Sequence, residues 1–166
     1  MRGFDISEYR ERVKKANILM EQNNLEMLLI TSPQNFRYFT GMDSYFWESP
    51  TRPWFLLLSL KDDPVAIVPS IGENAIKKTW IKNIHTWKSP NPKDEGITAL
   101  KNVIILVKDR GLIGCEMGRE SFIRMTINDF NKLNNNLSNH KFVDASDLIW
   151  ELRMIKSINE IAKIKK

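Results

Sequence analysis

The stretch LEMLLITSPQNFRYFTG, residues 25–41, contains the signals from which the fold can be predicted. Its first seven residues form a short apolar run that is typical of a buried strand. Ser32 is a favourable N-cap and Pro33 a favourable first helical residue, so a helix should follow at once. Gly41 can adopt the left-handed conformation that ends many helices. A buried strand followed directly by a short helix indicates an α/β protein.

The same alternation continues on both sides of this stretch. Strands are predicted over residues 25–31, 54–60, 65–70, 84–88, 112–117 and 141–145. Further helices are predicted over residues 8–23 with Ser7 as cap, 72–80, 94–108 and 120–136, and from a cap at Ser146 onward. The turn sequence KDDP at 61–64 joins two strands as a hairpin. We therefore predict an α/β fold: a mixed, mostly parallel sheet of about five to six strands with one antiparallel hairpin and helices on both faces.

The net charge of +5 comes almost entirely from the C-terminal segment. Residues 152–166 carry five basic residues and one acidic residue, a net of +4, so the other 151 residues together carry +1. A solvated terminal helix explains this distribution better than a basic nucleic-acid-binding face does. We therefore expect no nucleic-acid partner.

The sequence shows no sign of export or of membrane insertion. The N-terminal residues, MRGFDISEYRERVKK, are charged where a signal peptide would be apolar. No apolar run approaches the roughly 18 residues that indicate a membrane span. The single cysteine, Cys115, cannot form an intramolecular disulfide. These features predict a cytoplasmic protein with no membrane partner.

Residues that could carry out chemistry are few. The two histidines, His85 and His140, lack the closely spaced His, Cys or carboxylate partners of a local metal site. Cys115 lies within an apolar strand pattern, which favours a buried and unreactive thiol. The glycines form neither of the common phosphate-binding fingerprints. We predict no catalytic residue and no metal ligand in this chain.

One loop combines aromatic and charged residues. The stretch YFWESPTRPW, residues 45–54, contains four aromatic residues, one Glu and one Arg. Aromatic residues and Arg are enriched at interface anchors, and an Arg can clamp a carboxylate. The same aromatic side chains could instead fold back onto the sheet. On the residues alone, a binding surface and a packing segment both stay open.

The last fifteen residues, LRMIKSINEIAKIKK, contain the start of a helix. Ser157 and Glu160 form a capping box, which predicts that a helix begins directly after the serine. Nine residues follow Ser157, fewer than the roughly 12–15 that an isolated helix needs in water. We predict one domain over residues 1–156. Residues 157–166 should begin the first helix of a further domain and be frayed or held by a neighbour.

Three of these stretches together resemble the N-terminal domain of the creatinase/prolidase/aminopeptidase P family. The first is residues 28–41, which fit the family's pattern through Asn35, Tyr38, Thr40 and Gly41. The second, IGCEM at 113–117, is similar to the family's "IG-x-E" strand. The third is residues 142–166, which fit through Leu152, Arg153, Lys156, Ser157, Glu160 and Ile161. The order of the three agrees with the family along essentially the whole chain.

This resemblance implies a ribonuclease H-like N-terminal domain whose catalytic partner is a separate "pita-bread" domain. In most members that second domain holds a pair of divalent metal ions (manganese, cobalt or zinc) with two Asp, one His and two Glu. This sequence has neither the spaced pair of Asp residues nor the His-Glu-Glu set. The expected parent is a metal-dependent Xaa-Pro dipeptidase or aminopeptidase. This chain would be its non-catalytic N-terminal domain, without a cofactor of its own.

The resemblance also implies a role in assembly and substrate access. In the family this domain helps to form a homodimer or higher homo-oligomer and overhangs a partner's active site. In creatinase-like members an Arg before a hydrophobic strand binds substrate, and Arg52 stands in a comparable place. We expect Arg52, with Trp47 and Phe46, to bind substrate. The alternatives are a creatinase- or ectoine hydrolase-type amidohydrolase as the parent, and a stand-alone peptide- or protein-binding module of the same fold.

Overall fold

Six strands form one sheet, in the order β4-β3-β2-β1-β5-β6, in the computed structural model, which describes residues 3–44 and 52–165. The strands are β1 (Met27–Ile30), β2 (Phe55–Ser59), β3 (Val65–Pro69), β4 (Asn83–Trp87), β5 (Gly111–Cys115) and β6 (His140–Asp144). The helices are α1 (Ile6–Gln22), α2 (Pro33–Thr40), α3 (Glu73–Ile76), α4 (Ile97–Val107), α5 (Ile127–Asn135), α6 (Ser146–Met154) and α7 (Ile158–Ile164). The predicted α/β class is confirmed.

Among these strands, β2 alone runs against the others. It pairs in antiparallel fashion with β1 on one side and with β3 on the other, and the β2–β3 pair is the predicted hairpin. The β1–β5, β3–β4 and β5–β6 pairs are parallel. As a result, the carboxyl ends of five strands and the start of β2 meet at one edge of the sheet. We call this edge the carboxyl edge.

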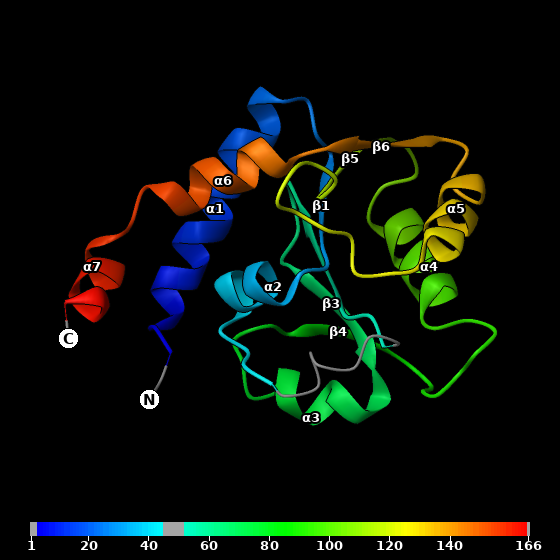
Figure 1. Ribbon diagram of the computed structural model, residues 1–166, viewed down its shortest axis with the longest axis horizontal. Helices are drawn as coiled ribbons and strands as arrows, with labels where there is room; N and C mark the ends of the chain where they lie inside the picture. The colour runs from blue at the N-terminus through cyan, green and yellow to red at the C-terminus, as the bar shows by residue number, and fades with distance from the viewer. Residues whose placement is uncertain (1–2, 45–51, 166) are drawn as a thin grey trace.

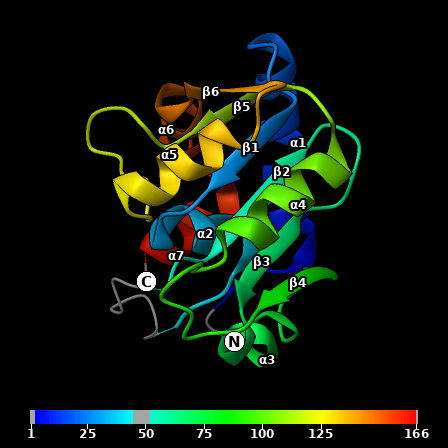
Figure 2. The ribbon, with the colours of Figure 1, turned by 90° about the vertical axis from the view of Figure 1, so that its right-hand side faces the viewer.

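Helices cover both faces of the sheet. On one face, α1, α2, α3 and α6 pack on strand side chains that include Leu28 and Leu56 (Figure 1). On the other face, α4 and α5 lie in front of the sheet in Figure 2 and pack on the alternate side chains, such as Leu29 and Leu57. Burial on both sides explains the continuous apolar sequences of the central strands.

The signals that flank α2 act as predicted. Ser32 is the N-cap, and its side chain accepts from the N–H of Asn35. Gly41 ends the helix in the left-handed conformation, with φ of 75°. A Cβ at Gly41 would also collide with the ring of Tyr9, so both the backbone and the packing require glycine there.

Several helix starts differ from the predictions. Helix α1 begins at Ile6 because Asp5, rather than Ser7, occupies the N-cap position. Helix α5 begins only at Ile127, where Thr126 caps it by accepting from a backbone N–H. Two further helices are shorter than predicted: α3 ends at Ile76, and α4 starts after Gly96.

The predicted capping box of α7 is confirmed. Ser157 Oγ accepts from the N–H of Glu160 at 3.1 Å, and Glu160 Oε2 accepts from the N–H of Ser157 at 2.9 Å. Helix α7 lies beside the first turns of α1 (Figure 1), and Asn159 Nδ2 of α7 donates to Glu8 Oε2 of α1. That residues 157–166 open a further domain stays a prediction.

Candidate functional site

A buried carboxylate, that of Glu116, organises the carboxyl edge. Glu116 directly follows β5 and is 1% exposed. Because β5 pairs in parallel with β1, Glu116 lies beside the end of β1. Its carboxylate accepts from the backbone N–H groups of Thr31 at 2.6 Å and Ser32 at 2.8 Å, and from the side-chain amide of Asn35 at 2.6 Å. We call these four residues the Glu116 cluster.

Two hydroxyl groups complete the surroundings of this carboxylate. Thr31 Oγ1 donates to Glu116 Oε2 at 3.1 Å, and Ser32 Oγ donates to Oε1. Since Ser32 caps α2, the carboxylate also faces the N-terminal end of that helix, where negative charge is favoured. A buried carboxylate without such donors would be costly. The Glu116 cluster therefore fastens β1, α2 and β5 together.

Asn35 and Tyr38 connect this cluster to α6. The Asn35 amide donates to Glu116 through Nδ2, and its Oδ1 accepts from Arg153 Nη1 at 2.9 Å. The Tyr38 hydroxyl donates to the carbonyl of Leu152 at 3.1 Å. Burial raises the pKa of Tyr38 to about 12, although the charge of Arg12 opposes the shift, so the phenol is a protonated donor at neutral pH.

Asp144 ties the residues after β5 to the start of α6. Its Oδ1 accepts from Ser146 N–H at 3.0 Å, Ser146 Oγ at 2.7 Å and Met117 N–H at 3.2 Å. The sequence predicts Ser146 as the cap of α6, but Ala145 holds that position, and the Ser146 hydroxyl accepts from Gly118 N–H instead. Partial burial raises the pKa of Asp144, but these hydrogen bonds outweigh it and hold the pKa below its ordinary value.

We expect Asp144→Asn to reduce the loss of folding stability that occurs when the pH is lowered. Because the pKa of Asp144 is lowered by folding, its contribution is complete above the unfolded pKa of about 3.9 and is lost as pH falls through the folded pKa. The urea midpoint of the variant should therefore drop less between about pH 6 and about pH 3 than that of the wild type. Equal drops in the two proteins would show that this carboxylate does not stabilise the fold.

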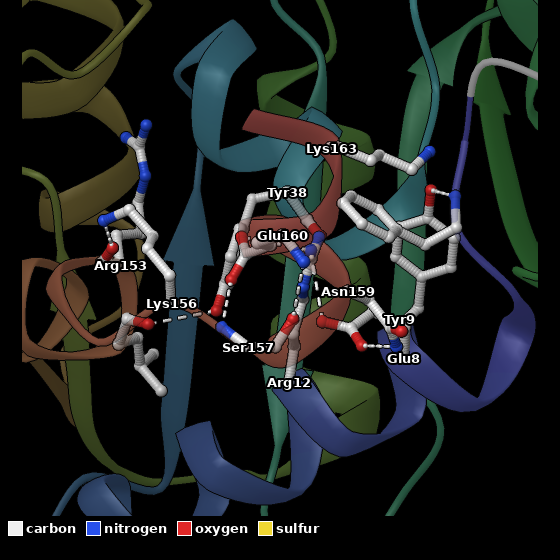
Figure 3. A network of polar contacts seen from close by, with 12 residues as sticks. Glu8, Tyr9, Arg12, Tyr38, Arg153, Lys156, Ser157, Asn159, Glu160 and Lys163 are labelled. Carbon is white, nitrogen blue, oxygen red and sulfur yellow. Dashed lines mark hydrogen bonds and ion pairs between the residues drawn. The ribbon is translucent and has the colours of Figure 1, made fainter. Parts of the chain in front are cut away.

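A cleft of about 630 Å³ opens beside the Glu116 cluster. Its walls come from α1, α2, α6, the residues after β5 and one side chain of α7. Arg12, Arg37 and Arg153 line it together with Glu120 and Glu160, so both signs of charge are present. Figure 3 shows Arg12 reaching from α1 toward the Tyr38 and Glu160 side chains. The size of the cleft is within the range of small-molecule and peptide sites.

The three residues expected to bind substrate are only partly described. Phe46 and Trp47 lie outside the described residues. Arg52 is half-buried and precedes β2. Since Leu56 pairs with Ile30 at the end of β1, Arg52 lies near the carboxyl edge, but it is not among the described residues that line the cleft. The substrate-binding role of all three therefore stays a prediction.

The histidines and the cysteine, which are the side chains most often used in metal binding or nucleophilic catalysis, do not form a common site. His85 is exposed on β4 and His140 is buried on β6, at opposite edges of the sheet. Cys115 is buried, as predicted, and this burial raises the pKa of its thiol. Within the described residues, no group of three or more His, Cys, Asp or Glu side chains is placed to hold a metal ion. No helix of the same residues combines the length and the apolarity needed to cross a membrane.

The sequence does not indicate that the residues that build this site lie together. Asn35, Glu116 and Arg153 are recognisable only as positions in a family pattern, and Glu160 only through that pattern and its capping box. That these residues form one site could not be inferred from the sequence, because they are far apart in the chain. The pattern itself was the usable signal, since polar residues within an apolar strand-and-helix framework are expected to meet partners. Arg12 had only its helical spacing from Glu8 as a signal.

Curated proteins similar to this chain include hydrolases and peptidases. The chain is 28% identical to an uncharacterized hydrolase/peptidase of Sinorhizobium fredii over 98% of its own length and 42% of the relative's. It is 27% identical to the ectoine hydrolase of Halomonas elongata over 95% of its own length and 40% of that protein. The chain therefore spans about two fifths of the curated relatives that it matches.

Solved structures share the fold. A prolidase from Thermococcus sibiricus matches with a TM-score of 0.75 and 21% identity, over 93% of this chain and 39% of that one. A domain of a dipeptidase from Streptococcus thermophilus matches with a TM-score of 0.68 and 15% identity, over 86% of this chain and 98% of that one. The model of the creatinase/prolidase N-terminal domain matches residues 12–155. The chain thus belongs to the creatinase/prolidase N-terminal domain family.

Proposed function

We propose that this chain is the non-catalytic N-terminal domain of a metal-dependent Xaa-Pro dipeptidase or aminopeptidase. One observation carries the proposal: almost the whole chain matches a hydrolase/peptidase relative, yet it covers only 42% of that relative. The remainder of such a protein would provide the catalytic machinery. Solved prolidases, of which the chain covers a similar share, support the same division.

The proposal assigns metal chemistry to the second domain. A pair of manganese, cobalt or zinc ions would polarise the scissile carbonyl and activate water there, held by carboxylate and imidazole ligands. The described residues of this chain could not hold such a metal pair, because no three or more of their His, Cys, Asp or Glu side chains are grouped to bind a metal ion. We therefore assign no chemical step to this domain.

The domain's own role would be assembly and substrate access. Its partners would be the second domain of the same chain and further copies in a homodimer or higher oligomer, in the cytoplasm. The position of Arg52 near the carboxyl edge is compatible with contact to substrate in such an assembly. Two alternatives stay open. The identity to an ectoine hydrolase favours an amidohydrolase parent, and a stand-alone peptide- or protein-binding module of the same fold is the other alternative.

An assay of two proteins tests the proposal. The 166-residue chain and the product of its complete reading frame would be incubated with Xaa-Pro dipeptides, and separately with ectoine, in the presence of manganese or cobalt. We expect hydrolysis of the dipeptides by the longer protein only. Cleavage by the 166-residue chain alone, or a reading frame that ends at Lys166, would refute the proposal. Hydrolysis of ectoine in place of dipeptides would favour the amidohydrolase alternative.

We expect Arg52→Ala in the full-length enzyme to lower kcat/KM with little loss of stability. A half-buried Arg in the segment before β2 contributes little to the core, whereas a clamp on the substrate carboxylate contributes directly to binding. Loss of one charge-assisted contact should lower kcat/KM by roughly 10- to 100-fold. Arg110→Ala, at an exposed Arg beside β5, is the control. A lower thermal midpoint with unchanged kinetics would mark Arg52 as structural.

A further inference from the structure

Helix α7 is attached to the domain almost entirely by polar groups. It has no buried residue in the described chain, and Ile158 and Ile164 are 77% and 70% exposed. A helix of seven residues is not stable on its own in water. Its attachment must therefore come from the polar contacts that it makes with α1 and with the residues just before α1.

Arg12 is the centre of these contacts. It is 4% exposed, and its Nη2 lies 3.2 Å from Glu160 Oε1 of α7 and 3.4 Å from Glu8 Oε1 of α1. Its Nη1 donates to the carbonyl of Tyr38 at 2.6 Å. A buried charge is costly without partners, and here two carboxylates and a carbonyl offset that cost, while the buried Nε has no hydrogen-bond partner among the described residues.

Aromatic rings enclose the same guanidinium. Its central carbon lies 4.2 Å from the centroid of the Tyr38 ring and 4.5 Å from that of Phe4. A flat guanidinium can stack on rings and donate in its own plane at the same time, which a lysine ammonium cannot do. The site is therefore specific for arginine.

Three further contacts join α7 to the start of the chain. Asn159 Nδ2 donates to Glu8 Oε2 at 2.8 Å (Figure 3). Lys163 Nζ lies 4.2 Å from the Phe4 ring centroid and donates to the carbonyl of Gly3. Burial raises the pKa of Glu8, but the hydrogen bonds from Asn159 and Ser157 and the charge of Arg12 outweigh it. The pKa of Glu8 therefore lies below its ordinary value, and the group is ionised at neutral pH.

Glu160 links the folding of α7 to its attachment. One carboxylate oxygen, Oε2, completes the capping box by accepting from Ser157 N–H at 2.9 Å. The other, Oε1, receives Arg12 at 3.2 Å. The same side chain thus starts the helix and binds it to α1, so each event favours the other.

We propose that Arg12 is a positioning residue that acts through Glu160 and holds α7 in one orientation on α1. We call Arg12, Glu8, Asn159 and Glu160 the clasp. If the protein continues into a second domain beyond α7, the clasp would orient that domain. This second step rests on the function proposed above. The attachment of α7 itself does not depend on that function and can be measured in the 166-residue chain.

Hydrogen exchange of the wild-type chain and its variants tests the clasp. The reporters are the amides of Ile161 and Lys165, which donate within α7, and the amides of β1 serve as an internal reference. Arg12→Met keeps an unbranched side chain of similar length but removes the charge and the donors. It should speed exchange in α7 by about tenfold or more and leave the β1 amides nearly unchanged. Arg12→Lys should not restore protection.

Arg37→Met is the matched control. Arg37 also lines the cleft and lies 3.4 Å from a carboxylate, that of Asp43, but this ion pair is exposed. Its loss should leave exchange in α7 unchanged. Equal acceleration by Arg37→Met and Arg12→Met would overturn the proposal, since a general change in charge would then explain both.

Glu160→Gln provides an independent variant. Glutamine can still complete a capping box, so only the attachment to Arg12 is weakened. Exchange in α7 should rise, and the double variant with Arg12→Met should add little to the larger single effect, because both remove the same contact. Unchanged exchange in Glu160→Gln would refute the clasp. So would a double variant whose acceleration of exchange equals the product of the two single accelerations. The result for Glu160→Gln stands even if Arg12→Met destabilises the whole domain. No catalytic activity enters the readout, so an inactive parent protein would refute only the proposed function.

Discussion

Glu116→Ala should lower the free energy of unfolding by about 3–5 kcal/mol, the largest effect expected of any polar substitution in the described chain. The change leaves the N–H groups of Thr31 and Ser32 and the amide of Asn35 without their acceptor in a buried place. It also opens a cavity between β1, β5 and α2. Urea denaturation of the 166-residue chain, followed by far-UV circular dichroism, measures the difference.

Two companion variants separate charge from shape in this experiment. Glu116→Gln keeps the size and one acceptor oxygen but turns an NH₂ group toward donors, so about 2 kcal/mol should be lost. Glu151→Ala, at an exposed position on α6, should change stability by no more than about 0.5 kcal/mol. If Glu116→Ala unfolds at the same urea concentration as Glu151→Ala, the Glu116 cluster does not hold the carboxyl edge together.

Trp54→Ala should cost a similar amount, about 3–5 kcal/mol, for an apolar reason. Trp54 is fully buried and meets Phe36 edge-on, with ring centroids 6.2 Å apart at 84°. A Cβ at Gly72 would collide with the indole, so the neighbouring backbone is fitted closely to this ring. Removing the indole therefore leaves a cavity that the surroundings can fill only in part.

Trp150→Ala is the control for that measurement. Trp150 is 45% exposed on α6 and lines the cleft, so its removal should cost less than about 1 kcal/mol. A small loss in both variants would show that the region around Trp54 can repack. Trp54 is the one aromatic residue of the 45–54 stretch that the structure describes, and for it the packing interpretation is confirmed.

Local signals in the sequence predicted the elements well. Ser32, Gly41 and the Ser157–Glu160 capping box act within a few residues of themselves, so their effect could be inferred without the rest of the fold. The turn at 61–64 likewise placed the hairpin. The N-cap of α1 was predicted wrongly, because two nearby residues can both act as a cap. Both Asp5 and Ser7 suit an N-cap, and the sequence alone does not say which is used.

Contacts between distant residues could not be predicted in the same way. The helix predicted from residue 120 starts only at Ile127, in part because Arg124 N–H donates to Thr31 Oγ1 at 2.9 Å, a partner 93 positions away. Arg12 and Glu160 are separated by 148 positions. Such pairs depend on the order of the strands and on how the helices pack beside them, which local sequence patterns do not specify.

The reversed direction of β2 has a consequence for how this domain can diverge. The segment after α2 leaves from Gly41, in the wall of the cleft, and returns at Trp54, next to the carboxyl edge. Because both ends lie on the same side of the molecule, residues can be inserted, deleted or exchanged between them without shifting the pairing of β1 with β2. Changes of length or composition in this connection therefore leave the register of the sheet unchanged, because the pairing of Leu56 with Ile30 begins only beyond it.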